Sequence, residues 1–172
     1  RIVSLCRERN LPMASHDDTL DEHIAQAVAE GIVISEFPTT LKAARLARKA
    51  GIRIVMGGPN LVRGGSHSGN VSARELAEEG LLDIISSDYV PGSLVAGAFA
   101  LRQCLGLSLH EAVARISANP AAAVGLSDRG AITCGLRADL VRVREIEGVP
   151  AVLQTWAVGC SGPLEIPAKN AA

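Results

Sequence analysis

Aromatic residues are nearly absent from this chain, whose 172 residues include two Phe, one Tyr and one Trp. No excess of positive charge is present either, because 17 Lys and Arg stand against 18 Asp and Glu. Proteins that bind nucleic acids combine a basic surface with aromatic side chains that stack on bases. We therefore expect no nucleic-acid partner. No apolar run reaches the roughly 20 residues that cross a bilayer, so we also expect no membrane partner.

Closely spaced cysteine pairs are also missing. The four cysteines lie far apart and form no CxxC motif, at Cys6, Cys104, Cys134 and Cys160. Such isolated thiols are typical of a reducing, cytoplasmic setting, where cysteine serves as a small core residue. The chain has no initiator Met and no signal-like segment. Residues 1–9 have the pattern of the last turns of an amphipathic helix, which suggests a piece of a longer protein.

Short apolar runs alternate with helical patterns over the first two thirds of the chain. Four runs have the character of strands buried on both faces, at residues 11–14, 31–35, 52–56 and 81–85. Capping-box sequences precede three expected helices, at Thr19, Ser72 and Ser108, each with a Glu three residues later. The alternation predicts an α/β fold with a parallel sheet. The alternation does not distinguish half of an eightfold barrel from most of a small doubly wound sheet.

The pattern changes near residue 119. A short helix is expected at residues 119–126, followed by glycine-separated β runs at 130–132, 135–143 and 152–160. These runs predict a small β appendage. We therefore expect an α/β part at residues 1–125, a small β subdomain segment at 126–162 and a tail at 163–172.

Polar clusters follow the apolar runs. They lie at residues 15–18, 36–40, 59–70 and 86–89. The carboxyl ends of parallel strands meet at one edge of a sheet, where α/β proteins hold their sites. The cluster at 59–70 combines Arg63, His67 and three glycines, which suits a loop that holds an anion such as a phosphate.

Residues 119–126 and 129–141 resemble the carboxyl-terminal signature of the amidohydrolase superfamily. The polar clusters further resemble those of the superfamily's diphosphatases in the carbon-phosphorus lyase pathway. This resemblance implies strands five to eight of a metal-dependent (β/α)8 TIM barrel and a small β-sandwich subdomain. The implied reaction hydrolyses a sugar 5-triphosphate to the 5-phosphate and pyrophosphate in phosphonate catabolism, with one or two divalent ions such as Zn or Mn.

The resemblance also implies roles for single residues. His16 and Asp88 are expected metal ligands, and Asp88 also takes the proton from the attacking water. Glu36 stands where many amidohydrolases carry a second metal-binding His, so either Glu36 or His67 is the expected further ligand. His67 has two further possible roles, as a phosphate ligand or a catalytic proton donor. Expected substrate-binding residues are Arg63, Asn60, Ser66, Ser68, Asn70, Asp17 and Tyr89.

Some features have plainer explanations. Asp18, and less readily Asp17, could simply cap the helix that follows. His23 and His110 lie within expected helices and are expected at the surface or behind the site. Two other functions also fit the pattern: hydrolysis of a C–N bond, or an inactive half-barrel that needs a partner chain. A homo-oligomer is possible under any of these readings.

Overall fold

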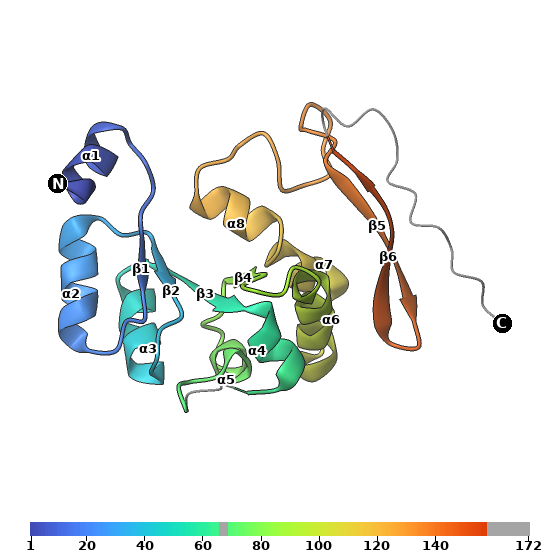
Figure 1. The fold of residues 1–172 in the computed structure, drawn as a ribbon, viewed down its shortest axis with the longest axis horizontal. Helices are drawn as coiled ribbons and strands as arrows, with labels where there is room; N and C mark the ends of the chain where they lie inside the picture. Colours follow the sequence, from blue (N-terminus) through green and yellow to red (C-terminus); the bar gives the residue numbers. More distant parts are fainter. Residues whose placement is uncertain (66–68, 158–172) are drawn as a thin grey trace.

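A parallel four-stranded sheet organises the first two thirds of the chain (Figure 1). The structure is a computed structural model, and it describes residues 1–65 and 69–157. The strands are β1 (Ala14–His16), β2 (Ile34–Glu36), β3 (Arg53–Gly57) and β4 (Ile84–Ser86), and they pair in that order. A doubly wound sheet reverses its strand order at a switch point. These four strands advance in one direction, which is the order found around a barrel.

Four helices follow the strands and contact one another in sequence. They are α2 (Asp21–Glu30), α3 (Leu41–Lys49), α5 (Ala73–Glu78) and α6 (Ser93–Leu105). Lys42 of α3 lies 2.6 Å from Asp21 of α2, and Arg45 lies 2.7 Å from Glu79 at the end of α5. Ile54 of β3 is fully buried in the same core as Leu76 and Leu101. The core therefore lies between the sheet and these helices, and the predicted α/β alternation is confirmed.

Two of the three predicted capping boxes are confirmed. Ser72 and Glu75 cap α5, and Ser108 and Glu111 cap α7 (Leu109–Ala114) by the same reciprocal hydrogen bonds. Hydrogen bonds from the backbone and hydroxyl of the serine hold the pKa of each glutamate below its ordinary value.

The predicted box between Thr19 and Glu22 is wrong. Helix α2 begins after Leu20, and the Nδ1 atom of His23 accepts the Thr19 backbone N–H at 3.1 Å. The ring of His23 reaches back by one turn and accepts the hydrogen bond that the pattern predicted for the Glu22 carboxylate. His23 is exposed, as expected, and so is His110.

The segment expected as an anion-binding loop is helical over its first part. Helix α4 (Gly58–Arg63) starts directly after β3, with Pro59 in its first turn and Gly64 in the left-handed conformation at its end. Pro59 and Leu61 are buried, so this part of the segment belongs to the core. A single apolar turn after a proline is too short to show helical periodicity, which is why the sequence predicted a loop there.

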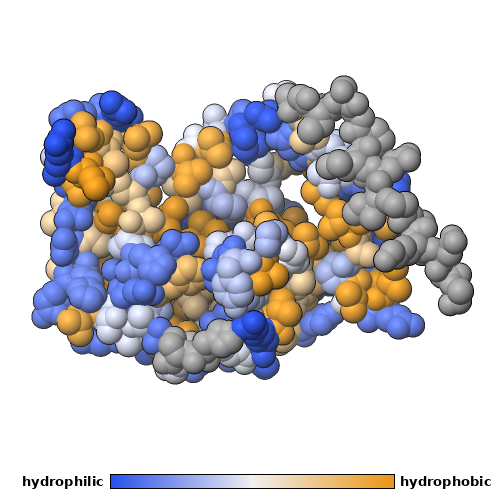
Figure 2. Space-filling model, viewed as in Figure 1, coloured by the Kyte–Doolittle hydropathy of each residue, from blue (hydrophilic) through white to orange (hydrophobic). Residues whose placement is uncertain are grey.

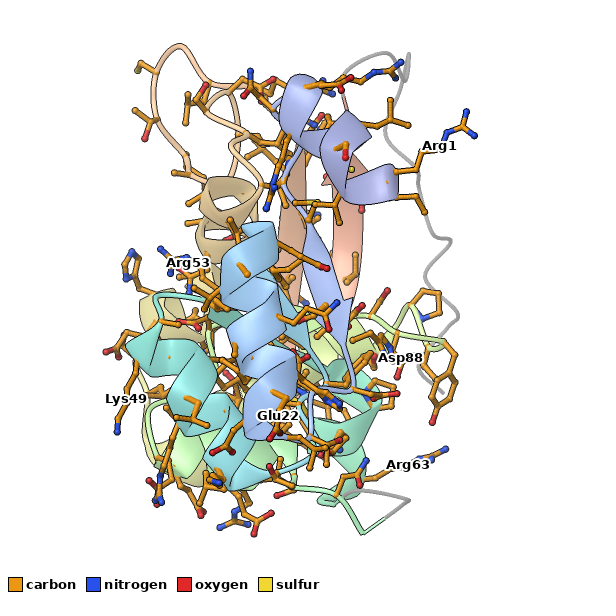
Figure 3. All side chains as sticks on the ribbon, turned by 90° about the vertical axis from the view of Figure 1, so that its left-hand side faces the viewer. Arg1, Glu22, Lys49, Arg53, Arg63 and Asp88 are labelled. Carbon is orange, nitrogen blue, oxygen red and sulfur yellow. The ribbon has the colours of Figure 1, made fainter. Side chains whose placement is uncertain are left out.

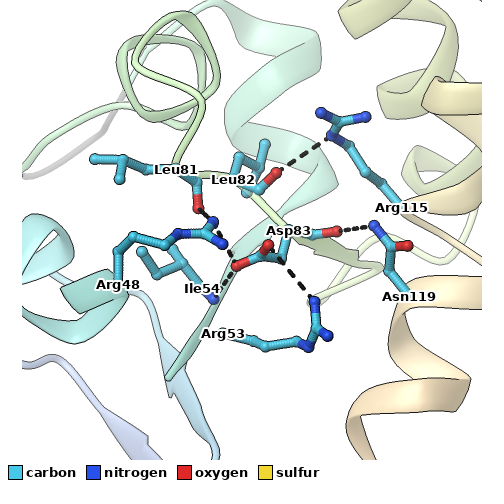
Figure 4. Close-up of polar contacts among 8 residues, drawn as sticks. All are labelled: Arg48, Arg53, Ile54, Leu81, Leu82, Asp83, Arg115 and Asn119. Atoms are coloured by element: carbon cyan, nitrogen blue, oxygen red, sulfur yellow. Dashed lines mark hydrogen bonds and ion pairs between the residues drawn. The ribbon is translucent and has the colours of Figure 1, made fainter. Parts of the chain in front are cut away.

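A buried polar network fixes the amino end of β4 (Figure 4). The Asp83 carboxylate accepts hydrogen bonds from Arg48 and from the backbone N–H of Ile54, both at 2.8 Å. The side-chain amide of Asn119 donates to the Asp83 carbonyl at 2.8 Å. Asn119 belongs to α8 (Ala118–Ala123). The carboxyl-terminal signature thus ties the last helix of the α/β part to the sheet.

The β appendage is a single antiparallel hairpin in the described residues. Strands β5 (Leu140–Ile146) and β6 (Val149–Trp156) pair antiparallel, with one register shift between Arg142 and Val143. The hairpin contacts α6, where Arg102 lies 2.6 Å from Glu145 and Gln103 donates to the Gly148 carbonyl. The strand predicted at residues 130–132 is not formed: residues 130 and 131 are bends, and residue 132 has no regular structure. The predicted run at 152–160 ends in β6 at Trp156, and its last three residues lie outside the described part.

The cysteines were only partly predicted. Cys104 and Cys134 are exposed and Cys6 is half-buried, so the expectation of core residues is wrong for the first two. Cys160 lies outside the described residues. Over the two described stretches, no helix combines the length and the apolar character that a membrane crossing requires.

Apolar side chains reach the surface around α1 (Ile2–Glu8), at the upper left of Figure 2. This helix was expected from residues 1–9, and none of its residues is buried. Ile2 is 78% exposed and the neighbouring Leu11 is 52% exposed.

Candidate active site at the carboxyl edge of the sheet

His16 and Glu36 lie side by side at the ends of their strands. The two residues are register partners of the parallel pair β1–β2, and Glu36 is in turn the partner of Val55 in β3. Adjacent parallel strands are about 4.8 Å apart, and register partners project to the same face of the sheet. An imidazole and a carboxylate therefore sit next to each other on one face. Ser15 and Ser35, one residue earlier, project to the opposite face.

The His16 ring has two close neighbours. Its Nδ1 atom lies 3.0 Å from Oδ2 of Asp17, and its ring meets that of Phe37 edge to face at a centroid distance of 5.2 Å. A carboxylate at Nδ1 favours the proton on that nitrogen, which leaves the lone pair of Nε2 for a ligand. Asp17, predicted to bind substrate, is thus placed to orient His16. The side chains of His16 and Asp17 are 58% and 60% exposed, so the pair faces an open space.

Three non-glycine residues at this edge have left-handed backbone conformations. Asp17 follows β1 with φ of 58°, Phe37 follows β2 with φ of 54°, and Asp88 follows β4 with φ of 50°. Such conformations are unfavourable for L-residues and cluster at functional sites. They turn the chain sharply at the end of each strand.

Asp88 lies over the last residue of β3. A Cβ atom at position 57 would lie 2.9 Å from Oδ2 of Asp88 and 3.3 Å from Cε1 of Phe37. Gly57 thus allows the Asp88 carboxylate and the Phe37 ring to approach the backbone of β3. Because the same Phe37 ring contacts His16, these residues form one continuous cluster. Sequence reasoning did not single out Phe37 or Gly57, since both act through contacts between distant segments.

Replacing Gly57 with alanine is expected to displace Asp88 from this position. For the triphosphate hydrolysis expected from the sequence, kcat should fall about 100-fold. A displacement of a reacting group by about 1 Å commonly has an effect of that size. The matched control is Gly92→Ala, because Gly92 has open space around its Cβ position and an ordinary backbone conformation. The measurement is steady-state kinetics of both variants. Equal activities would show that the close approach at Gly57 has no part in the reaction.

A pocket of about 190 Å³ opens between these strand ends and α4. Its lining includes Asp88, Phe37 and Gly57, together with Asn60, Asn70 and Tyr89. The Oδ1 atom of Asn60 accepts the Ala73 backbone N–H at 2.9 Å and so holds the start of α5. Its side-chain NH₂ group is the part that can meet a ligand.

Arg63 and Tyr89 stand together beside the pocket. The Arg63 guanidinium lies over the Tyr89 ring at 5.9 Å from the ring centre. Arg63 and Asp88 project on the same side of the molecule, whereas Lys49 and Arg53 lie on the opposite side (Figure 3). The predicted residues Ser66, His67 and Ser68 lie outside the described residues.

Asp18 is not a member of this open cluster. It is 4% exposed, and its carboxylate accepts hydrogen bonds from the hydroxyls of Ser15 and Ser35. It does not cap α2 either, because the helix begins after Leu20. Asp18 therefore lies on the helix-covered face, behind His16 and Glu36.

The residues at this edge fit part of a divalent metal site. Imidazole and carboxylate donors such as His16, Glu36 and Asp88 suit zinc and related ions. Among the described residues, no three His, Cys, Asp or Glu side chains converge closely enough to hold a metal by themselves. His16, Glu36 and Asp88 therefore do not form a metal site by themselves in the described part of the chain.

Comparison of the sequence with known families identifies the class of protein. The chain belongs to the Amidohydrolase family, whose sequence profile matches residues 1–159. Over 160 residues it is 49% identical to the alpha-D-ribose 1-methylphosphonate 5-triphosphate diphosphatase of Escherichia coli strain K12. That match covers 92% of this chain and 42% of the Escherichia coli protein. The chain therefore spans less than half the length of this relative.

Two further similarities were found. The chain is 40% identical over 74 residues to an imidazolonepropionase of Deinococcus radiodurans, which covers 40% of this chain and 18% of that protein. The fold resembles a solved amidohydrolase from Thermotoga maritima MSB8, with a TM-score of 0.65 and 21% identity. That similarity covers 85% of this chain and 42% of the solved one, and it bears on the fold alone.

Proposed function

We propose that this chain supplies half of the active site of a metal-dependent triphosphate diphosphatase. Its substrate would be alpha-D-ribose 1-methylphosphonate 5-triphosphate, and its products the 5-phosphate and pyrophosphate. The observation that carries the proposal is the placement of His16, Glu36 and Asp88 at one strand edge, in a chain 49% identical to that diphosphatase. The reaction belongs to phosphonate catabolism.

The proposed architecture is a (β/α)8 barrel of which this chain forms one half. Residues 1–125 would form strands five to eight of a (β/α)8 barrel, because their strands advance in one direction with the helices on one face. Residues 126–162 would belong to a small β-sandwich subdomain, to which the described hairpin contributes two strands. Both strands at the ends of the described sheet would then pair with the other half of the barrel.

His16 and Asp88 would hold one or two divalent ions, with Glu36 or His67 as a further ligand. A bound divalent ion supplies Lewis acidity, which makes an attacking water more acidic. The chain's own residues would carry the remaining steps. Asp17 orients His16, and Asp88 accepts the proton of the water as it attacks the α-phosphorus. The bond between the α-phosphorus and the bridging oxygen breaks, and pyrophosphate leaves with that oxygen.

Arg63 is proposed to bind the departing pyrophosphate. A guanidinium presents a rigid pair of N–H donors that matches phosphate oxygens, and Arg63 projects on the same side of the molecule as Asp88. The pocket beside Arg63 is lined by Asn60, Asn70 and Tyr89, which would donate hydrogen bonds to the substrate. His67, Ser66 and Ser68 stay predicted members of the same phosphate site.

The direct test of this function is an assay of the protein in its full natural length. Incubation with the ribose triphosphate and Mn²⁺ or Zn²⁺ is expected to release pyrophosphate and the 5-phosphate. The Escherichia coli relative, assayed alongside, serves as the positive control. A protein that releases no pyrophosphate while the relative does would contradict the proposed function. The same assay on the 172-residue chain alone, with sedimentation and metal analysis, tests whether this half can act by itself or as an oligomer.

Replacing Arg63 with alanine separates this function from hydrolysis of a C–N bond. We expect KM for the triphosphate to rise about 10- to 100-fold, because a hydrogen-bonded charge contributes about 1.5–3 kcal/mol. The matched control is Arg74→Ala, which removes an exposed arginine paired with Glu78 on α5. Steady-state kinetics measures both. An amide substrate without phosphates would give an Arg63→Ala enzyme with unchanged KM.

A further inference from the structure

Asp18 is a buried carboxylate that the proposed reaction does not use. It is 4% exposed, and its Oδ2 atom accepts hydrogen bonds from Ser15 Oγ at 2.5 Å and Ser35 Oγ at 2.6 Å. These lengths are typical of strong hydrogen bonds from a hydroxyl to a carboxylate. Burying a carboxylate is unfavourable unless such bonds compensate for the lost water. Burying the Asp18 carboxylate therefore costs free energy, and the presence of this residue here needs a physical explanation.

The two serines connect Asp18 to the proposed metal ligands. Ser15 and Ser35 are register partners, and they directly precede His16 and Glu36. One carboxylate oxygen thus joins β1 to β2 one residue before the two ligands and on the opposite face of the sheet. Two backbone bonds close the same region: Asp17 N–H donates to the Glu36 carbonyl, and Thr39 N–H donates to the Asp18 carbonyl.

The register between β1 and β2 decides to which face of the sheet His16 and Glu36 project. A slip of one residue between paired strands moves a side chain to the other face of the sheet. β1 and β2 are only three residues long, so few ladder hydrogen bonds oppose such a slip. The Ser15–Asp18–Ser35 cluster adds two strong bonds that form only in the observed register.

We infer that Asp18 is a positioning residue, which holds His16 and Glu36 side by side for a divalent ion. It acts through the hydroxyls of Ser15 and Ser35 and does not touch the ion. This inference rests on the metal site of the proposed function, with Glu36 as its further ligand. It does not depend on the identity of the substrate.

The test compares three variants of the full natural-length protein: Asp18→Ala, Asp18→Asn and Asp83→Asn. Zn²⁺ affinity is measured by competition with a chelator, and the visible spectrum of the Co²⁺ form reports the ligand geometry. Thermal unfolding without metal measures stability. Asp83 is the matched control, because it too is a buried carboxylate hydrogen-bonded to the sheet, but at the amino end of β4.

Asp18→Ala is expected to weaken Zn²⁺ binding about 10- to 100-fold, as loss of residues behind metal ligands commonly does, and to change the Co²⁺ spectrum. Asp18→Asn should stay close to the wild type, because its amide oxygen can accept both hydroxyls. Asp83→Asn should lower the unfolding temperature and leave Zn²⁺ affinity unchanged. If Asp18→Ala fails to fold, Ser35→Ala removes one of the two donors and should weaken Zn²⁺ binding in the same direction.

Unchanged Zn²⁺ affinity in the folded Asp18→Ala or Ser35→Ala variant would overturn the inference. Equal losses in Asp18→Asn and Asp18→Ala would overturn it as well, because the hydrogen bonds would then not be the cause. If the variants weaken metal binding but the wild type releases no pyrophosphate, the inference stands and the proposed function fails. If the wild type releases pyrophosphate but the variants bind Zn²⁺ normally, only the inference fails.

Discussion

Asp88→Asn is expected to lower kcat for triphosphate hydrolysis about 1,000-fold. Asparagine keeps the size of the side chain over Gly57 but cannot accept a proton from the attacking water, and proton transfer by a positioned group contributes about 10²–10⁴-fold. It also loses a carboxylate that suits a divalent ion. The measurement is steady-state release of pyrophosphate at saturating metal.

The control for this variant is Asp21→Asn. Asp21 is an exposed carboxylate paired with Lys42 on the helical surface. The Asp21→Asn variant should release pyrophosphate at the wild-type rate. An Asp88→Asn enzyme within a few-fold of the wild type would contradict the role of Asp88 as proton acceptor.

Asp83→Ala is expected to lower the free energy of unfolding by about 3 kcal/mol. The Asp83 carboxylate is 10% exposed and binds Arg48 and the Ile54 backbone, with Arg53 at 3.9 Å. Removing this buried carboxylate leaves the Ile54 backbone N–H and the half-buried Arg48 guanidinium without their acceptor, and each unsatisfied donor costs about 1–3 kcal/mol. Chemical denaturation of the two proteins measures the difference.

The matched control is Asp21→Ala, which removes an ion pair whose side chains are 54% and 71% exposed. Exposed pairs contribute less than about 1 kcal/mol, so this variant should unfold close to the wild type. Similar losses in the two variants would show that the Asp83 network has no special part in holding the sheet.

The strand ends could be predicted from the sequence because each apolar run stops at a polar cluster. His16 and Glu36 were placed at two such ends, and the register now shows them side by side. The order of the strands could not be read from periodicity, because half a barrel and a doubly wound sheet share the same alternation of elements. The structure supplies that order, since β1 to β4 pair as they follow one another in the chain.

Other features depend on contacts between distant segments. Phe37 contacts both His16 and the region of Gly57, and nothing in its local sequence indicates that role. Asp18 looked like a helix-capping acid because it precedes an expected helix by one residue. In the structure it does not cap that helix and instead accepts hydrogen bonds from two serines on neighbouring strands. Local patterns could not reveal either arrangement.

We propose that the carboxyl edge of this sheet holds a divalent ion. Anomalous X-ray diffraction from crystals of the full natural-length protein grown with Zn²⁺ tests it most directly. We predict a zinc peak about 2.0–2.2 Å from a His16 ring nitrogen and from an Asp88 carboxylate oxygen. A protein that binds zinc at another place, with His16 and Asp88 both beyond coordination distance, would contradict the account.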